Sequence, residues 1–170
     1  MSIHQVLGDL ATALAGVLER ELPRVEGDWW KTCVIDRLSI QQQRLVTERH
    51  VNSLSGLDLA GLLRVFDQNW SALGYRLNLD QQARNWLKEA QGIRNRWAHL
   101  PLGGLRAADA YRDIDTLYRL LIVLAANPTV LERANADRLR MLARLAPLAN
   151  APKRASRFPM ATLSWSTRHQ

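Results

Sequence analysis

The chain has 170 residues, of which 47% are apolar, which fits one ordinary domain with enough apolar side chains for a core. A single cysteine, Cys33, excludes an intramolecular disulfide framework and favours a reducing compartment, and with only four histidines a zinc finger is excluded too. No apolar run reaches about 18 residues and no basic leader is present, so we expect no membrane contact and a cytoplasmic location.

The net charge of +7 is unevenly distributed along the chain. Residues 1–127 carry 15 basic and 14 acidic side chains, whereas residues 128–170 carry 8 basic and 2 acidic ones. Electrostatic attraction to phosphate groups is therefore expected to begin at the C-terminal end. An interpretation that stays equally open is a solvated basic extension that aids solubility.

The N-terminal third is predicted to be mostly helical. Apolar residues spaced by three and four predict an amphipathic helix from residue 3 until Pro23 stops it. A second helical segment is expected to start at Asp28, with Cys33 and the tryptophans packed in the core. The polar stretch 39–50 fits no clear pattern, and residues 53–56 are typical of a loop.

The remainder of the chain shows stronger helical periodicity. Residues 59–73 form a clear apolar stripe that predicts a helix ended by Gly74. Asn78 and Gln81 have the spacing of a capping pair at the start of the next helix. Three further helices are predicted over 79–99, 107–126 and 128–149.

No alternating strand pattern and no internal repeat occurs, so the sequence predicts an all-α fold, a helical bundle with additional N-terminal and C-terminal helices. We expect residues 1–127 to form the bundle, 128–149 to form a basic C-terminal helix, and 150–170 to be a basic tail or linker.

The candidate chemistry lies at the end of helix 79–99, in the run Arg94-Asn95-Arg96-Trp97-Ala98-His99. The chain has no glycine-rich phosphate loop, no nucleophile elbow and no metal-binding spacing. At 100° per residue, Arg94 falls about 40° from the centre of the apolar stripe, inside the apolar arc. An arginine there is costly unless it is paired or reaches an anionic group at the surface.

Two interpretations of this run are open. Arginine can clamp a phosphate, histidine can transfer a proton near neutral pH, and Asn95 can orient either one. The structural alternative is a favourable histidine at a helix end and an arginine that extends out of the core. Because Arg94 and His99 lie about 140° apart on an ideal helix, two copies meeting across a two-fold axis would assemble such a site more easily than one.

Arg94-Asn95, followed after three residues by His99, resembles the Arg-x4–6-His signature of the HEPN superfamily. Arg44 with His50 also fits this short pattern. The flanking segments LLRVFDQNWSALG and DAYRDIDTLYRLL, and the early Asp28-Trp29-Trp30, resemble the Swt-type branch over residues 5–126. That branch includes an RNA-surveillance endonuclease and N-terminal domains of bacterial ATPases and helicases linked to phage defence.

The resemblance implies an HEPN-type bundle that forms a homodimer through helix 79–99. Its catalytic members are endoribonucleases that use no metal or other cofactor and leave 2′,3′-cyclic phosphate ends. It further implies that His99 activates the ribose 2′-hydroxyl or protonates the leaving oxygen, that Arg94 stabilises the scissile phosphate, and that Asn95 positions RNA or His99. Contacts to the RNA backbone are expected from four more arginines: Arg96, Arg138, Arg140 and Arg144. Phage defence, a toxin–antitoxin pair or RNA surveillance is the expected setting.

Two departures keep a second function open. The segment LPLGGLRAAD after the motif is apolar and contains glycine where the resemblance implies a more acidic, helix-capping stretch. The body is also nearly neutral, which is unusual for a domain that binds RNA unaided. The alternative is a non-catalytic HEPN dimerisation or adaptor domain that docks to a larger ATPase or helicase, and an antitoxin is a further expected partner. A DNA-binding protein is less favoured because no helix-turn-helix pattern is present.

Overall fold

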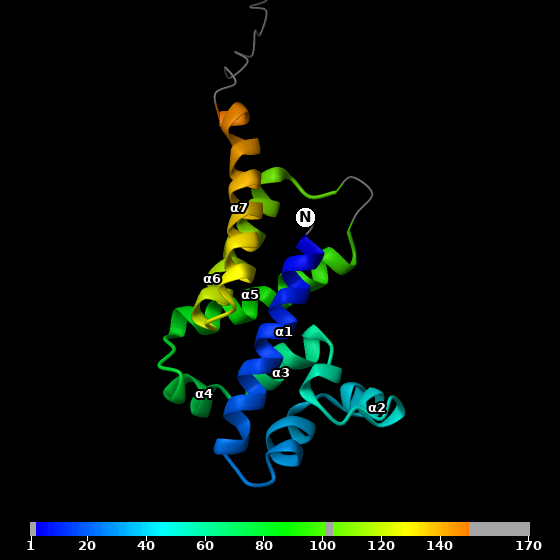
Figure 1. Cartoon of the computed structure of the whole chain (residues 1–170). Helices are drawn as coiled ribbons and strands as arrows, with labels where there is room; N and C mark the ends of the chain where they lie inside the picture. The colour runs from blue at the N-terminus through cyan, green and yellow to red at the C-terminus, as the bar shows by residue number, and fades with distance from the viewer. Residues whose placement is uncertain (1–2, 101–103, 150–170) are drawn as a thin grey trace, which may run out of the picture.

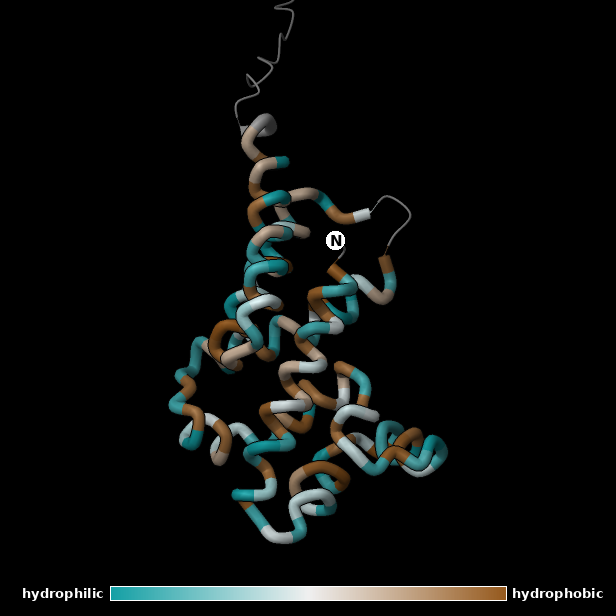
Figure 2. Tube along the Cα trace, in the orientation of Figure 1, coloured by the Kyte–Doolittle hydropathy of each residue, from teal (hydrophilic) through white to brown (hydrophobic). Residues whose placement is uncertain are grey.

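A computed structural model describes residues 3–100 and 104–149, and within them it contains helices and no strands, which confirms the all-α prediction. The predicted tail, 150–170, lies outside the described residues. Seven α-helices are described: α1 Ile3–Glu21, α2 Ile40–Glu48, α3 Leu59–Gln68, α4 Trp70–Arg76, α5 Gln81–Ala98, α6 Ala107–Val123 and α7 Pro128–Ala149. Figure 1 shows α1 running through the middle of the bundle, and Figure 2 shows hydrophobic and hydrophilic residues interleaved along the helices.

The core forms around α1, α3, α5 and α6. The predicted stripe of α1 is buried, with Leu10 and Leu14 fully inaccessible, and this helix packs against both α3 and α6. Pro23 lies in a 3₁₀ turn, Leu22–Arg24, directly after α1, as a residue without a free N–H should. The helix that bears the motif, α5, packs between α3 and α6, and α7 packs along α6. The core therefore covers α5 where it meets α3 and α6, and the rest of its surface stays accessible.

The segment that the sequence left unassigned contains a regular helix. Ser39 caps α2: its side chain accepts a hydrogen bond from the N–H of Gln42, and the Gln42 side chain accepts one from the N–H of Ser39. No residue of α2 is buried, and the helix projects from the bundle (Figure 1). Before α2, a π-helical turn, Trp30–Val34, and a 3₁₀ turn, Ile35–Arg37, place Cys33 in the core as predicted.

The prediction of one helix over 59–73 is wrong, because the structure breaks it at Asn69. Asn69 is buried, and its side-chain amide donates to the carbonyl oxygen of Cys33 at 2.8 Å and to that of Val65 at 2.7 Å. This side chain ties the break to the π-helical turn, and α4 starts at the next residue, Trp70. Gly74 lies inside α4 and does not end a helix.

The predicted capping pair is also wrong. Asp80 caps α5, since its carboxylate accepts from the N–H of Ala83 at 2.9 Å. Asn78 instead ends α4 in a left-handed conformation with φ +52°, and the N–H of Leu79 returns to the carbonyl of Gly74. Asparagine tolerates this conformation better than most residues, so its presence marks the end of α4 and not the start of α5.

The remaining helices lie where apolar stripes predicted them. The structure gives α5 as Gln81–Ala98, within the predicted 79–99, and α6 as Ala107–Val123, within 107–126. Ala125 ends α6 with φ +51°, and the N–H of Ala126 returns to the carbonyl of Leu121. The α7 helix follows directly and its buried Ala134 faces α6.

Candidate functional site

The candidate motif occupies the last turns of α5 and the residue that caps it. Arg94, Asn95 and Arg96 are helical, and His99 is the C-cap, with its N–H donating to the carbonyl of Arg96 at 3.3 Å. Pro101 follows two residues later, and the residue before a proline disfavours the helical conformation, which accounts for the end of the helix here. At 100° per residue, side chains two positions apart, such as those of Arg94 and Arg96, point to nearly opposite sides of α5.

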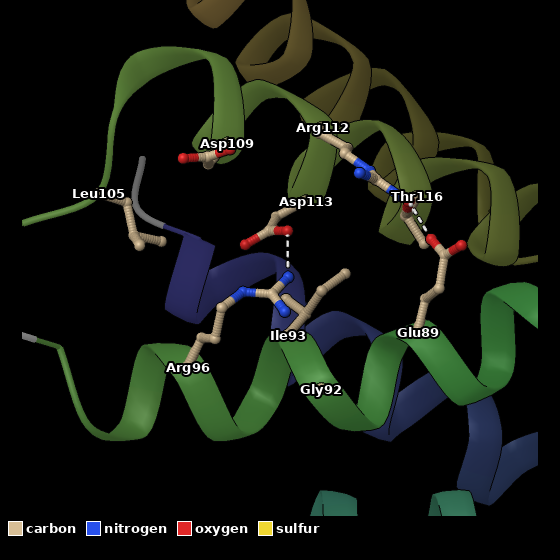
Figure 3. A pocket seen from close by; sticks show the side chains of 9 residues that line it. All are labelled: Glu89, Gly92, Ile93, Arg96, Leu105, Asp109, Arg112, Asp113 and Thr116. Atoms are coloured by element: carbon tan, nitrogen blue, oxygen red, sulfur yellow. Dashed lines mark hydrogen bonds and ion pairs between the residues drawn. The ribbon is translucent and has the colours of Figure 1, made fainter.

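The α6 side of the motif is occupied by structural contacts. Asp113 of α6 is only 3% exposed, and its carboxylate accepts from Arg96 Nη2 at 2.5 Å and from Trp97 Nε1 at 2.8 Å. Figure 3 shows Arg96 reaching from α5 to Asp113, and, about two turns earlier on the same side of α5, Glu89 accepting a hydrogen bond from Thr116. Burial of a carboxylate is tolerated because both of its oxygens accept strong hydrogen bonds. Arg96, predicted to bind RNA, thus holds α5 to α6 in this structure.

The other side of the motif is accessible. Arg94 Nη2 lies 3.5 Å from Asp58 Oδ2, at the long limit of a hydrogen bond, and Arg94 Nη1 donates to Asn95 Oδ1 at 3.2 Å. Asp58 also caps α3, since its Oδ1 accepts from the N–H of Gly61 at 2.8 Å. The Arg94 side chain is 36% exposed. An arginine near the apolar stripe is expected to be costly in desolvation free energy. The pairing with Asp58 and the exposure of the guanidinium at the surface offset that cost.

A polar cleft of about 310 Å³ opens beside Arg94, between the N-terminal end of α2, α3 and α5. Its polar lining residues are Ser39, Gln41, Gln42, Arg64, Gln91, Arg94 and Asn95. The structure thus brings two of the three predicted catalytic residues to one cleft. His99 does not line it; this side chain is exposed and makes no hydrogen bond with any described residue.

The predicted RNA-binding arginines of α7 differ in their surroundings. Arg138 donates to Asp115 at 3.0 Å and its guanidinium stacks 5.0 Å from the centre of the Tyr118 ring, so it packs α7 onto α6. Arg140 forms an ion pair with the buried Asp137. Arg144 is exposed, and its nearest polar contact is the sulfur of Met141 at 3.9 Å. Only Arg144 is thus available to a ligand without breaking an ion pair among the described residues.

Sequence reasoning did not single out Asp58, Arg64 or Asp113. Asp113 could have been found from the sequence, because it falls on the apolar face of α6 between Ala110 and Leu117, where a carboxylate needs a partner. Asp58 and Arg64 could not have been, since an N-cap aspartate and a helical arginine are ordinary surface residues.

Within residues 3–100 and 104–149, no group of three or more His, Cys, Asp or Glu side chains is arranged to hold a metal ion. In the same part of the chain, no helix is long and apolar enough to cross a membrane.

The fold and the motif define a helical domain of the HEPN class. A family model described as Swt1-like HEPN matches residues 5–124, so the chain belongs to the Swt1-like HEPN family. The match runs from α1 to the end of α6 and leaves α7 outside. No curated protein and no solved structure matches the chain.

Proposed function

We propose that this protein is a metal-independent HEPN endoribonuclease that acts as a homodimer. The observation that supports the proposal is that neighbouring residues at the end of α5 make very different contacts with the rest of the fold. Arg96 and Trp97 are bound to Asp113, whereas Arg94, Asn95 and His99 make few contacts that the fold requires. Family membership supports the same interpretation.

The chemistry follows from the residue types. The imidazole of His99 takes the proton of a ribose 2′-hydroxyl while the 2′-oxygen attacks the adjacent phosphorus. The bond from phosphorus to the 5′-oxygen of the next nucleotide breaks, and that oxygen takes a proton from solvent, to which the His99 imidazolium then gives up its own. The products are a 2′,3′-cyclic phosphate and a 5′-hydroxyl. The guanidinium of Arg94 leaves its long contact with Asp58 and stabilises the charge on the non-bridging oxygens. Asn95 orients Arg94 through their mutual hydrogen bond.

The proposed site is composite. Arg94 and Asn95 line the polar cleft and His99 does not, so one chain does not place all three side chains in this cleft. A two-fold axis that brings two α5 ends together pairs Arg94 of one copy with His99 of the other. We propose this homodimer through α5 as the active form.

The biological setting is proposed from the family. We propose a role in phage defence, in a toxin–antitoxin pair or in RNA surveillance, with an ATPase, a helicase or an antitoxin as partner. The alternative is a non-catalytic adaptor that docks to a larger ATPase or helicase. It is favoured by the ion pairs that occupy Arg96, Arg138 and Arg140 and so reduce the cationic surface.

The test compares the wild type with His99→Ala and Arg94→Ala in an RNA cleavage assay with EDTA present. We expect each variant to lose at least about 100-fold in rate, with cyclic phosphate ends from the wild type only. His50→Ala is the matched control, because His50 is an exposed histidine after a helix and also follows an arginine, Arg44, at a comparable spacing. Folded wild-type protein that leaves RNA intact would support the adaptor function instead.

The same two variants test the composite site. When Arg94→Ala and His99→Ala chains are mixed, a mixed dimer regains one intact site, so activity should return to about a quarter of the wild type. A mixture that stays inactive while the subunits exchange would show that each chain builds its own site. Sedimentation that finds only monomer at the concentrations of the cleavage assay would exclude the proposed homodimer.

A further inference from the structure

The polar cleft beside Arg94 holds a second guanidinium that the motif does not include. Arg64, one turn from the end of α3, lines the cleft opposite α5. Its Nε donates to the carbonyl oxygen of Arg37 at 2.7 Å, so the base of the guanidinium is fixed to the backbone. Among the described residues Arg64 has no carboxylate within ion-pair distance, and its terminal nitrogens remain for a ligand.

Arg64 belongs to a group of cations that the fold leaves unpaired. In and next to α2 and α3, four arginines lack a carboxylate partner among the described residues: Arg37, Arg44, Arg49 and Arg64. On α6 and α7, Arg119, Arg133, Arg138 and Arg140 are paired with acids, and Arg112 and Arg144 are the arginines without a carboxylate partner among the described residues. Residues 37–64 carry four arginines and two acids, Glu48 and Asp58, so the segment around α2 and α3 has an excess of two positive charges within a body of near-zero net charge.

The cleft also presents amide groups next to these cations. Gln91 lies one turn before Arg94 on α5 and lines the same cleft, so the lining runs along the helix away from the motif. Gln41 lines it from α2, and Arg44 follows Gln41 by one turn on the same face. Side-chain amides offer both a donor and an acceptor, which is what the edge of an unpaired base requires.

We propose that this cleft binds the single-stranded RNA that flanks the scissile phosphate, with Arg64 holding a backbone phosphate and Gln91 facing a base. The proposal rests on the proposed nuclease function, because it places this RNA beside Arg94. A cleft of about 310 Å³ is of the size that takes one nucleotide and is too small for a duplex. Arg44 continues the positive track from the cleft along the exposed face of α2.

The test measures RNA binding separately from cleavage. All variants carry His99→Ala, and a short fluorescein-labelled single-stranded RNA is titrated at several salt concentrations. Arg64→Ala should weaken binding about tenfold and lower the slope of log affinity against log salt by about 0.7, the value for one phosphate contact to a single strand. Arg44→Ala should have a smaller effect in the same direction and, being on an exposed helix, should leave folding intact.

Arg112→Ala is the matched control. Arg112 is also exposed and has no carboxylate partner among the described residues, and it lines a second cleft, between α5 and α6, on the other side of α5 from Arg94 (Figure 3). Its replacement removes the same charge, and we expect affinity to stay within about twofold of the parent. Thermal unfolding of each variant confirms that the fold is kept.

The outcomes separate this proposal from the proposed function. Selective loss with Arg64→Ala supports the cleft even if the wild type cleaves no RNA, in which case the nuclease fails and the binding site stands. Equal losses with Arg64→Ala and Arg112→Ala would mean general charge attraction and would overturn the cleft. No measurable RNA binding by the parent protein, or unchanged binding with both Arg64→Ala and Arg44→Ala, would overturn it as well.

Discussion

The two sides of α5 use neighbouring arginines in opposite ways. Arg96 faces α6 and is bound to a buried carboxylate, Asp113, whereas Arg94, two residues earlier, faces the polar cleft with one long contact to the exposed Asp58. Both side chains belong to the same short motif, and their residue type is identical. The difference lies in what the adjoining helix offers to each of them.

A charged motif can thus contain one arginine that the fold binds tightly and another that it binds weakly. A buried carboxylate must be satisfied, so Arg96 and Trp97 are committed to it before any ligand arrives. An exposed carboxylate is already solvated, and its hold on Arg94 is weak. Arg94 can therefore exchange Asp58 for a phosphate at little cost, which Arg96 cannot do with Asp113.

The largest expected effect comes from removing the carboxylate on the α6 side. Asp113→Ala should lower the free energy of unfolding by about 3 kcal/mol, because it leaves the Trp97 N–H without an acceptor and opens a void. Urea unfolding measures the change. Asp58→Ala is the control, and should cost only about 1 kcal/mol through the lost α3 cap. If the two variants lost the same free energy of unfolding, the two carboxylates would not differ in their structural role.

A second buried carboxylate extends the comparison to another part of the molecule. Glu21 accepts from Arg20 at 3.0 Å and from Arg76 of α4 at 3.0 Å, and its bond to Arg20 holds the pKa of the carboxyl below its ordinary value. Glu21→Gln should therefore cost about 2 kcal/mol at neutral pH.

The pH dependence of that cost has a defined sign. The folded chain keeps Glu21 charged at pH values where the unfolded chain, with a pKa near 4.5, already binds a proton. The contribution of Glu21 is thus complete above that pH and is lost as the pH falls through the lowered pKa of the folded state. The stability gap between wild type and Glu21→Gln should shrink below about pH 4. A gap that is constant with pH would show that the carboxylate charge contributes nothing.

The parts of this fold that follow a local pattern could be predicted from the sequence. The stripes of α1, α5 and α6 repeat every three to four residues, and each helix lies where its stripe does. The breaks could not be predicted, because they depend on distant partners. Asn69 divides α3 from α4 by bonding the carbonyl of Cys33, 36 residues earlier in the chain. No pattern within the 59–73 segment contains that information.

The sequence supplies the candidate motif, but it does not supply the surroundings that the fold gives to each of its residues. The sequence places Arg94 near the apolar stripe, and it cannot say that Asp58, at a distant position in the chain, receives it. It also gives equal weight to Arg96 and Arg144, although one is bound to Asp113 and the other is exposed. Which arginine stays available depends on the acids of other helices, and these come together only in the folded chain.

The smallest expected effect on stability, a comparison of Arg96→Ala with Arg94→Ala, is also the sharpest test of the two sides. Both variants remove one positive charge from α5 and add the same helix-favouring alanine. Arg96→Ala should cost about 1 kcal/mol, since half-exposed Arg96 supplies one of two donors to Asp113, and Arg94→Ala should stay within about 0.5 kcal/mol. RNA cleavage should follow the reverse order, with Arg94→Ala inactive and Arg96→Ala active in proportion to its folded fraction. If Arg96→Ala folds normally and yet loses cleavage, Arg96 contacts RNA, and the boundary between the structural and the functional side of α5 lies elsewhere.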